Sequence, residues 1–336
     1  MVVAAEDREP PRRWQVDGPP FENGIAVVVG TSGSTGEPKG VQLSREAILA
    51  SVNATHQRLG GPGNWVCPLP LHYVAGVMTG ARAAVAGTRL SVVPPDLSRL
   101  PLNEGRNYVS VVAAQLHRAL DSSASTEALS RFDAVLVGGS AIPAGLLQQG
   151  RHAGLNLVAT YGMAETCGGC VYDGAPLDGV EVTIGDDDRI SLTGPVVFSG
   201  YRLDPRATAA VLHDRTLRTN DRGRWLNERL QVLGRADDVV ITGGNNVDLG
   251  LVQRAADDEF GPGRLAVLAV PDERWGARIV ALTDLALDLD ECRTRLGGRL
   301  EPAAVPRDLR RVAGLPRTST GKIDGQSLRA LWAEGS

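Results

Sequence analysis

Lysine is almost absent from this chain of 336 residues. Its 35 basic residues include only two lysines, Lys39 and Lys322, and the other 33 are arginines. So much arginine beside abundant alanine, glycine and valine indicates a genome whose coding bias favours arginine. Because that background replaces lysine nearly everywhere, the two lysines that are present are candidates for a specific chemical role.

Other absences exclude whole classes of protein. No run of about 18 apolar residues is present, so we expect no transmembrane helix. The N-terminal residues are acidic and rich in proline where a secretory signal needs an apolar stretch. A net charge of −4 gives no basic surplus and argues against nucleic acid or an anionic membrane as a partner. We therefore expect a globular cytoplasmic protein.

Cysteine is also scarce, with four residues in the whole chain. Cys167 and Cys170 form a single C-x-x-C, while Cys67 and Cys292 stand alone. A zinc site needs further ligands at regular spacing, and none follow. We therefore expect the pair to fill a glycine-rich turn, with a metal or redox role as the minor alternative.

The order of apolar segments predicts an α/β fold. A β-branched run at 24–30 predicts a buried strand, and the segment 41–60 predicts a helix that Ser44 caps. Strand-then-helix segments repeat as far as residue 166, after which the chain becomes rich in strands until about residue 233. The charged segment 234–238 precedes a new strand and indicates a boundary. We predict a large domain of sheets flanked by helices over 1–235 and a small α+β domain over 236–336.

The segment 31–40 is predicted to bind phosphate. Its glycines let backbone N–H groups approach an anion, its hydroxyls add donors, and its lysine adds positive charge. It does not match the Walker A spacing. The residues concerned are Thr31, Ser32, Gly33, Ser34, Thr35, Gly36 and Lys39.

Three further segments carry groups suited to a nucleotide. Two follow predicted strands, where ligands gather in open α/β sheets; these contain Gly138, Gly139 and Ser140 in the first, and Tyr161, Gly162, Glu165 and Thr166 in the second. Tyr161 could stack on a base, and Glu165 could hold a divalent cation. The third segment contains Asp221, whose carboxylate can accept hydrogen bonds from both ribose hydroxyls. Near the C-terminus, Lys322 lies in a loop of glycine and hydroxyl residues and could be delivered to a reacting centre.

These motifs, in this order, resemble the superfamily of adenylate-forming enzymes, which includes acyl- and aryl-CoA ligases, peptide-synthetase adenylation domains and luciferases. The segments TSGSTGEPKG, YGMAET, GRADDVVITGG and PRTSTGKID carry the resemblance from Thr31 to Lys322. It implies a large N-terminal adenylation domain and a mobile C-terminal lid. It also implies ATP, Mg²⁺ and CoA, with a small carboxylic acid as the substrate. A homodimer is compatible with the sequence but is not specified by it.

The resemblance assigns a role to each motif. The 31–40 loop would hold the β- and γ-phosphates, and Gly139, Ser140 and Tyr161 would frame the adenine. Thr166 would approach the α-phosphate and Glu165 would help to bind Mg²⁺. Asp221 and Arg235 would hold the ribose, and Lys322 would stabilise charge during adenylation. The lid would turn at Asp237 and bring the Gly243–Gly244 loop to the site for thioester formation. The chain departs from the family in being short upstream of residue 31, in Ala164 and in Asn220, but none of these departures removes a predicted catalytic group.

The acyl pocket is expected to follow the segment 70–76, which contains His72 and Tyr73. Arg82 lies just downstream in an otherwise apolar helix, where burying it is costly unless it is paired. Either Arg82 extends to the surface, or it binds a second carboxylate of the substrate. A short chain with this segment and this arginine resembles the actinobacterial o-succinylbenzoate–CoA ligases of menaquinone biosynthesis. The alternatives are another aryl- or acyl-CoA ligase, a ligase that loads a carrier protein, and a non-catalytic ATP- or acyl-binding regulator.

Overall fold

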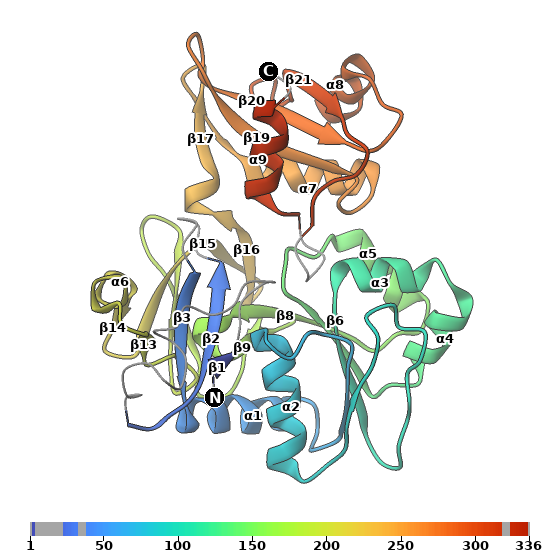
Figure 1. Ribbon diagram of the computed structural model, residues 1–336, viewed down its shortest axis with the longest axis vertical. Helices are drawn as coiled ribbons and strands as arrows, with labels where there is room; N and C mark the ends of the chain where they lie inside the picture. Colours follow the sequence, from blue (N-terminus) through green and yellow to red (C-terminus); the bar gives the residue numbers. More distant parts are fainter. Residues whose placement is uncertain (1, 4–22, 33–37, 318–322, 335–336) are drawn as a thin grey trace. The chain divides into compact units, whose positions relative to one another are not determined.

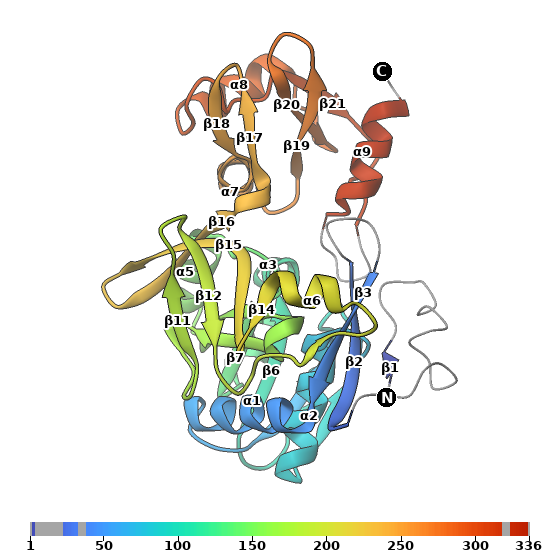
Figure 2. The ribbon, with the colours of Figure 1, turned by 90° about the vertical axis from the view of Figure 1, so that its left-hand side faces the viewer.

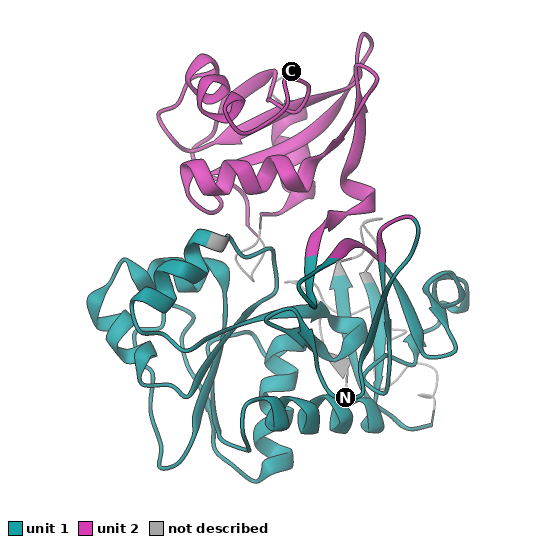
Figure 3. Ribbon diagram, turned by 180° about the vertical axis from the view of Figure 1, so that it is seen from behind, with its two compact units in different colours: residues 1–186, 190–219, 225–231 teal, residues 187–189, 220–224, 232–336 magenta. Residues whose placement is uncertain are grey.

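The computed structural model describes residues 2–3, 23–32, 38–317 and 323–334. The chain divides into two compact units, coloured separately in Figure 3. Unit 1 comprises residues 1–186, 190–219 and 225–231, and unit 2 comprises residues 187–189, 220–224 and 232–336. Each unit has hydrophobic clusters of its own. Within the described ranges, no helix is long and apolar enough to cross a membrane.

Unit 1 is built on a seven-stranded sheet with the strand order β10-β9-β8-β7-β6-β4-β5. Its strands are β4 (Asn64–Cys67), β5 (Leu90–Val92), β6 (Asn107–Val112), β7 (Ala134–Gly138), β8 (Leu157–Met163), β9 (Gly168–Tyr172) and β10 (Ala175–Pro176). The neighbours β5, β4, β6, β7 and β8 run parallel, whereas β9 runs antiparallel to β8. The loops after the parallel strands therefore leave the sheet at one edge.

Helices cover both faces of this sheet (Figure 1). They are α1 (Arg45–Arg58), α2 (Val74–Ala86), α3 (Ala113–Leu120), α4 (Ser123–Ser130) and α5 (Ala144–His152). Alternate residues of β6 serve opposite faces, as expected for a strand. Val109 and Val111 pack in one cluster with α3, α4 and α5, whereas Tyr108 packs in another with residues of α1 and α2.

Two smaller sheets complete unit 1. The first has the order β1-β2-β3-β13 and consists of β1 (Val2–Val3), β2 (Ile25–Ser32), β3 (Pro38–Ser44) and β13 (Gly200–Tyr201). The second has the order β11-β12-β15-β14, with β16 beside β15. It consists of β11 (Glu181–Ile184), β12 (Arg189–Thr193), β14 (Leu212–His213), β15 (Thr216–Leu226) and β16 (Arg229–Arg235), and α6 (Pro205–Val211) precedes β14. Parts of β12, β15 and β16 cluster with unit 2.

The predicted cap of the first helix is confirmed. The Ser44 side chain accepts a hydrogen bond from the backbone nitrogen of Ala47 at 3.1 Å. Residues 41–44 are strand rather than helix, because β3 pairs with β2 from Pro38 to Ser44. The phosphate-loop segment therefore joins two strands of a hairpin.

Unit 2 holds a five-stranded sheet with the order β18-β17-β20-β19 and with β21 beside β20. Its elements are β17 (Val239–Thr242), β18 (Asn245–Asp248), α7 (Leu249–Phe260), β19 (Leu265–Asp272), β20 (Gly276–Thr283), α8 (Leu289–Gly297), β21 (Asp308–Arg311) and α9 (Gly325–Glu334), which can be followed in Figure 2. Ala256 of α7 and Cys292 of α8 are fully buried with Leu265 and Ala281 of the sheet. The main span of this unit begins at Val232, close to the predicted boundary at 235.

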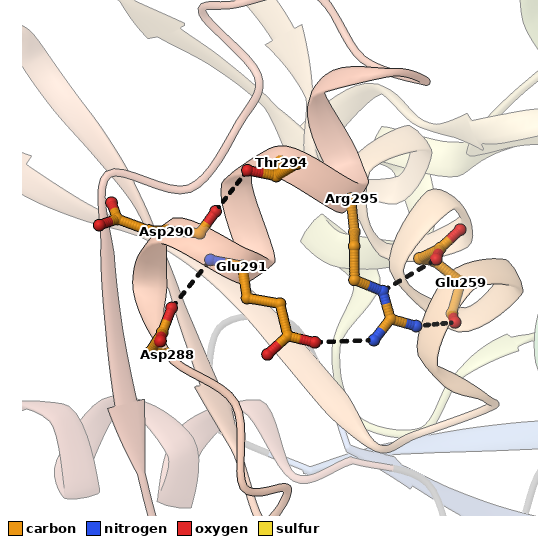
Figure 4. Close-up of polar contacts among 6 residues, drawn as sticks. All are labelled: Glu259, Asp288, Asp290, Glu291, Thr294 and Arg295. Atoms are coloured by element: carbon orange, nitrogen blue, oxygen red, sulfur yellow. Dashed lines mark hydrogen bonds and ion pairs between the residues drawn. The ribbon is translucent and has the colours of Figure 1, made fainter.

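Polar contacts join α8 to α7 at the surface of unit 2 (Figure 4). Asp288 caps α8 by accepting from the backbone nitrogen of Glu291 at 2.8 Å. Arg295 lies 3.0 Å from Glu259 and 3.3 Å from Glu291. Exposed ion pairs of this kind contribute at most about 1 kcal/mol each, so the burial of Cys292 and Leu296 provides most of the attachment.

The core of unit 1 gives a stability prediction. Leu116 of α3 is fully buried, and Leu116→Ala should lower the free energy of unfolding by about 2–5 kcal/mol through lost transfer energy and a residual cavity. Leu226→Ala is the control, since Leu226 is 52% exposed and its loss should cost less than about 0.5 kcal/mol. Urea denaturation measures both variants, and equal destabilisation would contradict the assigned core.

Candidate active site

The phosphate-loop segment is carried by the β2–β3 hairpin. Thr31 pairs with Lys39, and Ser32 pairs with Pro38. Because β2 and β3 are paired up to these residues, both ends of the loop are fixed. Gly33, Ser34, Thr35 and Gly36 lie outside the described residues, so their role as phosphate ligands stays a prediction.

The predicted adenine segment follows β7 at the carboxyl edge of the large sheet. A Cβ atom on Gly138 would lie 2.3 Å from the Thr160 hydroxyl of β8, so only glycine fits between the two strands. Gly139 has a φ of 84°, and both Gly139 and Ser140 are exposed. The chain therefore turns sharply here and presents backbone and a hydroxyl at the edge.

The next strand, β8, brings the YGMAET motif to the same edge. Tyr161 pairs with Val171 of β9, and the pairing is irregular between Tyr161 and Gly162. A Cβ atom on Gly162 would lie 2.1 Å from the carbonyl oxygen of Gly168. Glycine therefore permits the close approach of β8 and β9, directly before the turn that contains Glu165.

Glu165 is held by Tyr201, a residue that lies outside all the predicted site segments. The Tyr201 hydroxyl donates a hydrogen bond to Glu165 Oε1 at 2.8 Å. The Lys39 ammonium lies over the same tyrosine ring, with Nζ 4.9 Å from the centroid. Burial and the Glu165 charge raise the pKa of Tyr201 above its ordinary value, so the phenol stays protonated and remains a donor. One side chain thus touches both the phosphate-loop lysine and the predicted magnesium ligand.

The hydroxyl of Thr166 is hydrogen-bonded within the turn that contains it. It is fully buried, and its hydroxyl donates to the carbonyl oxygen of Gly168 at 2.8 Å and accepts from the backbone nitrogen of Met163 at 3.0 Å. These bonds hold the short 3₁₀ turn 164–166 and thereby orient Glu165. The expected approach of Thr166 to the α-phosphate stays a prediction.

The segment after β4 leads into α2 and supplies the predicted acyl-pocket residues. The His72 and Tyr73 rings are 4.4 Å apart between centroids. Nε2 of His72 is buried and has no hydrogen-bond partner in the described ranges. A Cβ atom on Gly76 would lie 2.3 Å from the carbonyl oxygen of Pro70, so the first turn of α2 packs closely on this loop.

Arg82 of α2 is only 4% exposed. The alternative that it extends to the surface is therefore wrong. Its guanidinium carbon lies 5.0 Å from the centroid of the Trp65 ring, and Nη2 makes a long hydrogen bond of 3.5 Å to the Tyr172 hydroxyl. Nε has no hydrogen-bond partner, and no carboxylate of the described residues pairs with Arg82. Within the described part of the chain, this buried cation thus has no counter-charge.

Two other buried polar atoms near Arg82 are unsatisfied. Neither Trp65 Nε1 nor His56 Nε2 has a hydrogen-bond partner among the residues that the structure describes. Burial first, and then the charge of Arg82, lowers the pKa of His56, so this imidazole is neutral near pH 7. It therefore adds no second positive charge beside the guanidinium.

In unit 2, the predicted ribose ligands and the predicted hinge residue form one cluster. Arg235 binds Asp237 through two hydrogen bonds of 2.8 Å and lies 3.6 Å from Asp221. Burial alone would raise the pKa of Asp237, but the Arg235 guanidinium lowers it below its ordinary value. Asp237 therefore stays ionised, which fixes the chain at the start of this unit.

The Gly243–Gly244 pair forms the tight turn between β17 and β18. Thr242 pairs with Asn245 across it, and the glycines have φ angles of 56° and 80°, which suit a two-residue hairpin turn. A Cβ atom on Gly243 would lie 2.6 Å from the Trp275 ring, whereas Gly244 faces open space. The turn is thus fixed on one side and free on the other.

Comparison with known proteins decides what these features belong to. The model of the AMP-binding enzymes matches residues 3–221, and that of the AMP-binding enzyme C-terminal domain matches residues 264–322. The chain belongs to the AMP-binding enzyme family. The predicted superfamily is thus confirmed.

Within the AMP-binding family, three relatives are informative. A probable 2-succinylbenzoate–CoA ligase from Mycobacterium tuberculosis is 39% identical over 329 residues, covering 93% of this chain and 85% of that protein. An indoleacetate–CoA ligase from Aromatoleum aromaticum is 30% identical over 338 residues, covering 90% of this chain and 66% of that protein. The solved structure of o-succinylbenzoate CoA synthetase (MenE) from Bacillus subtilis, in complex with the acyl-adenylate intermediate OSB-AMP, has a TM-score of 0.76 and 25% identity, covering 90% of this chain and 68% of that one.

Glu165 is suited to a magnesium ion of the kind that AMP-binding enzymes would use with ATP. Oε1 is hydrogen-bonded to Tyr201, while Oε2 has no hydrogen bond with the described residues. No group of three or more His, Cys, Asp or Glu side chains that could cage a metal occurs among the described residues. Mg²⁺ is commonly held by one or two carboxylates together with substrate phosphates, and a single free carboxylate oxygen fits that mode.

The four cysteines are buried and free. Burial raises the pKa of Cys167 and Cys170 to about 12 each and that of Cys292 to about 11. A thiol of this kind is neither a good nucleophile nor a good metal ligand, since both roles need the thiolate. The structure thus favours the packing interpretation of the C-x-x-C.

Tyr201, Trp65 and His56 were not predicted from the sequence. Tyr201 lies 36 residues beyond Glu165 in a strand of only two residues, and no periodic pattern marks it. Trp65 and His56 occur in segments that read as ordinary strand and helix. Only the fold brings them to Glu165 and Arg82, so no local signal could have identified them.

Thiol accessibility tests the burial of the cysteines. At pH 8, the native protein should react with Ellman's reagent at less than about one hundredth of the rate of a free thiol, because the thiols are both buried and protonated. After denaturation all four should react. Rapid labelling of the native protein at Cys167 or Cys170 would contradict the packing role.

Proposed function

We propose that this chain is an o-succinylbenzoate–CoA ligase of menaquinone biosynthesis. In the first step the acid attacks the α-phosphorus of ATP and releases pyrophosphate, and in the second step the thiol of CoA displaces AMP. Family membership supports the adenylation chemistry, and the named relatives support the thioester product. The choice of acid depends on one observation, which is the buried charge of Arg82 that no carboxylate of the described residues compensates.

The charge of Arg82 favours an acid with a second carboxylate. Removing a cation from water costs several kcal/mol, and the cost is recovered only through a partner with good geometry. The family reaction consumes one carboxylate of the substrate, so a monocarboxylate such as indoleacetate would leave Arg82 unpaired. o-Succinylbenzoate has two carboxylates, and the one that is not adenylated would neutralise the charge of Arg82. Trp65 Nε1, which also lacks a hydrogen-bond partner among the described residues, would be a further donor for the same group.

The adenylation step requires positioning and charge neutralisation. Lys39 and the 31–40 loop would bind the β- and γ-phosphates, and Gly139, Ser140 and Tyr161 would frame the adenine at the carboxyl edge of the sheet. Asp221 and Arg235 would hold the ribose. Glu165 would hold Mg²⁺, which when bound supplies positive charge to the phosphates. Lys322, outside the described residues, would stabilise the charge that develops as the carboxylate attacks.

The second step needs a different set of groups at the same place. We propose that the C-terminal domain from residue 236 acts as a lid that turns at Asp237 between the two steps. Its Gly243–Gly244 turn would then line the path of the CoA thiol. The open space beside Gly244 would allow a ligand to approach that backbone closely.

Two alternatives keep the adenylation chemistry and change the product. One is a CoA ligase for a monocarboxylic aryl or acyl acid, which the similarity to an indoleacetate–CoA ligase favours. The other is a ligase that loads a carrier protein. A non-catalytic regulator is disfavoured because Lys39, Glu165 and Lys322 are all present. We expect the enzyme to act in the cytoplasm, where ATP and CoA are made. We also propose a homodimer, which light scattering would test.

The proposed function is tested by ATP-dependent thioester formation with a panel of acids, read by mass spectrometry. With ATP, Mg²⁺ and CoA, o-succinylbenzoate should give its CoA thioester far faster than benzoate, octanoate or indoleacetate. A preference for a monocarboxylate would overturn the assignment of o-succinylbenzoate as the substrate. If every acid gave an acyl-adenylate but no CoA thioester, a carrier protein would replace CoA as the proposed acceptor.

Arg82→Met should separate recognition of the substrate from stability. The loss of the buried charge pair should weaken the binding of o-succinylbenzoate by about 30-fold or more, corresponding to about 2 kcal/mol. The binding of benzoate should change by less than about threefold. The melting temperature of the ligand-free variant should equal or exceed that of the wild type, because an uncompensated buried charge is removed. Arg89→Ala, which removes an exposed arginine bonded to Asn103, is the control and should change neither. Equal weakening of both acids would refute the anchoring role.

Lys322→Ala should separate the two half-reactions. Adenylation, measured by pyrophosphate exchange, should fall by at least about 100-fold because the developing charge loses its cation. Thioester formation from supplied acyl-adenylate should stay within about threefold of the wild type. Arg329→Ala, an exposed cation of α9, is the matched control. If both half-reactions fall equally, the assignment of Lys322 to the first step is wrong.

A further inference from the structure

Tyr201 is enclosed between two groups that the proposed function uses, and it has no assigned role. It is 9% exposed and belongs to β13, which pairs with β3 through Gly200 with Gln42 and Tyr201 with Val41. This pairing places the tyrosine beside β3, the strand that carries Lys39. Its backbone nitrogen is bound by the Thr208 hydroxyl at 2.9 Å, so the residue is fixed at the main chain as well as through its ring.

The segment before Tyr201 is fastened to the turn that carries Glu165. The backbone nitrogen of Phe198 donates to the carbonyl oxygen of Glu165 at 2.8 Å. The Phe198 and Tyr201 rings meet edge to face with centroids 5.0 Å apart. On the other side, the backbone nitrogen of Arg202 donates to the carbonyl oxygen of Gly40 at 2.7 Å. Residues 198–202 therefore connect the end of the phosphate-loop hairpin to the 164–166 turn.

We propose that Tyr201 is the positioning residue that sets Glu165 for Mg²⁺ and Lys39 for the phosphates of ATP, an inference that rests on the proposed function. The phenol acts on Glu165 because it occupies Oε1 and leaves Oε2 for the metal. The ring acts on Lys39 because it limits the ammonium to the space above its face. The two effects belong to different parts of the side chain and can be removed separately.

Tyr201→Phe removes only the phenol. ATP binding to the full chain is measured by titration calorimetry, once with MgCl₂ and once with EDTA. Hydrogen bonds to charged groups are worth about 1.5–3 kcal/mol, so the dissociation constant of Mg·ATP should rise about tenfold or more, while that of metal-free ATP should change less than about twofold. Tyr108→Phe is the matched control, since Tyr108 is a buried tyrosine whose phenol donates to two backbone carbonyls away from these groups. It should leave both constants within about twofold of the wild type.

Tyr201→Leu removes the ring as well. Metal-free ATP should now also bind about three- to tenfold more weakly, because Lys39 loses its support. In a protein that already carries Glu165→Gln, adding Tyr201→Phe should raise the dissociation constant of Mg·ATP by less than about a further twofold. A residue that acts through Glu165 has no carboxylate left to position in that variant.

Three results with the variants, and one with the wild type, would overturn the inference. Those with the variants are an unchanged Mg·ATP affinity in Tyr201→Phe, an equal loss with and without metal, and full additivity with Glu165→Gln. A wild-type protein whose ATP affinity does not depend on Mg²⁺ would overturn it too. Failure of the proposed function looks different, because Mg·ATP would then bind as described while no acid gave a CoA thioester.

Discussion

The buried guanidinium of Arg82 sets the strongest constraint on how this molecule works. It lies against Trp65 of β4 and Tyr172 of β9, and no carboxylate of the described residues balances it. A fold keeps such a charge only where something compensates its cost. A second substrate carboxylate would do so, and the binding of that group would then stabilise the protein as well as orient the acid.

The parallel strands of unit 1 place the remaining groups. The loops after β4, β7 and β8 carry the acyl-pocket, adenine and YGMAET segments, and all three leave the sheet at its carboxyl edge. The β2–β3 hairpin brings Lys39 to the same neighbourhood as Glu165, because Tyr201 contacts both residues. A reaction that depends on positioning more than on covalent catalysis suits a site of this kind.

The family, the α/β fold and the Ser44 cap could be predicted from the sequence alone, for identifiable reasons. The glycine and hydroxyl motifs are local and ordered along the chain, so they indicated the family and the α/β fold, and the Ser44 cap was read from a single residue. The short strand β13 and the contact of Tyr201 with Glu165 could not be read, because two paired residues leave no periodic signal. The burial of Arg82 could not be decided either, since a helix of alanines and valines permits both directions. Tertiary packing decided those two points.

The central claim is that a substrate carboxylate neutralises Arg82, and a crystal structure with a non-hydrolysable sulfamoyl analogue of the o-succinylbenzoyl adenylate tests it most directly. The account predicts the free carboxylate within hydrogen-bond distance of the Arg82 guanidinium, at roughly 2.7–2.9 Å. The adenosine should then lie at the carboxyl edge beside Gly139 and Tyr161. A free carboxylate that faces solvent, or one that binds another cation while Arg82 keeps its present contacts, would contradict the account.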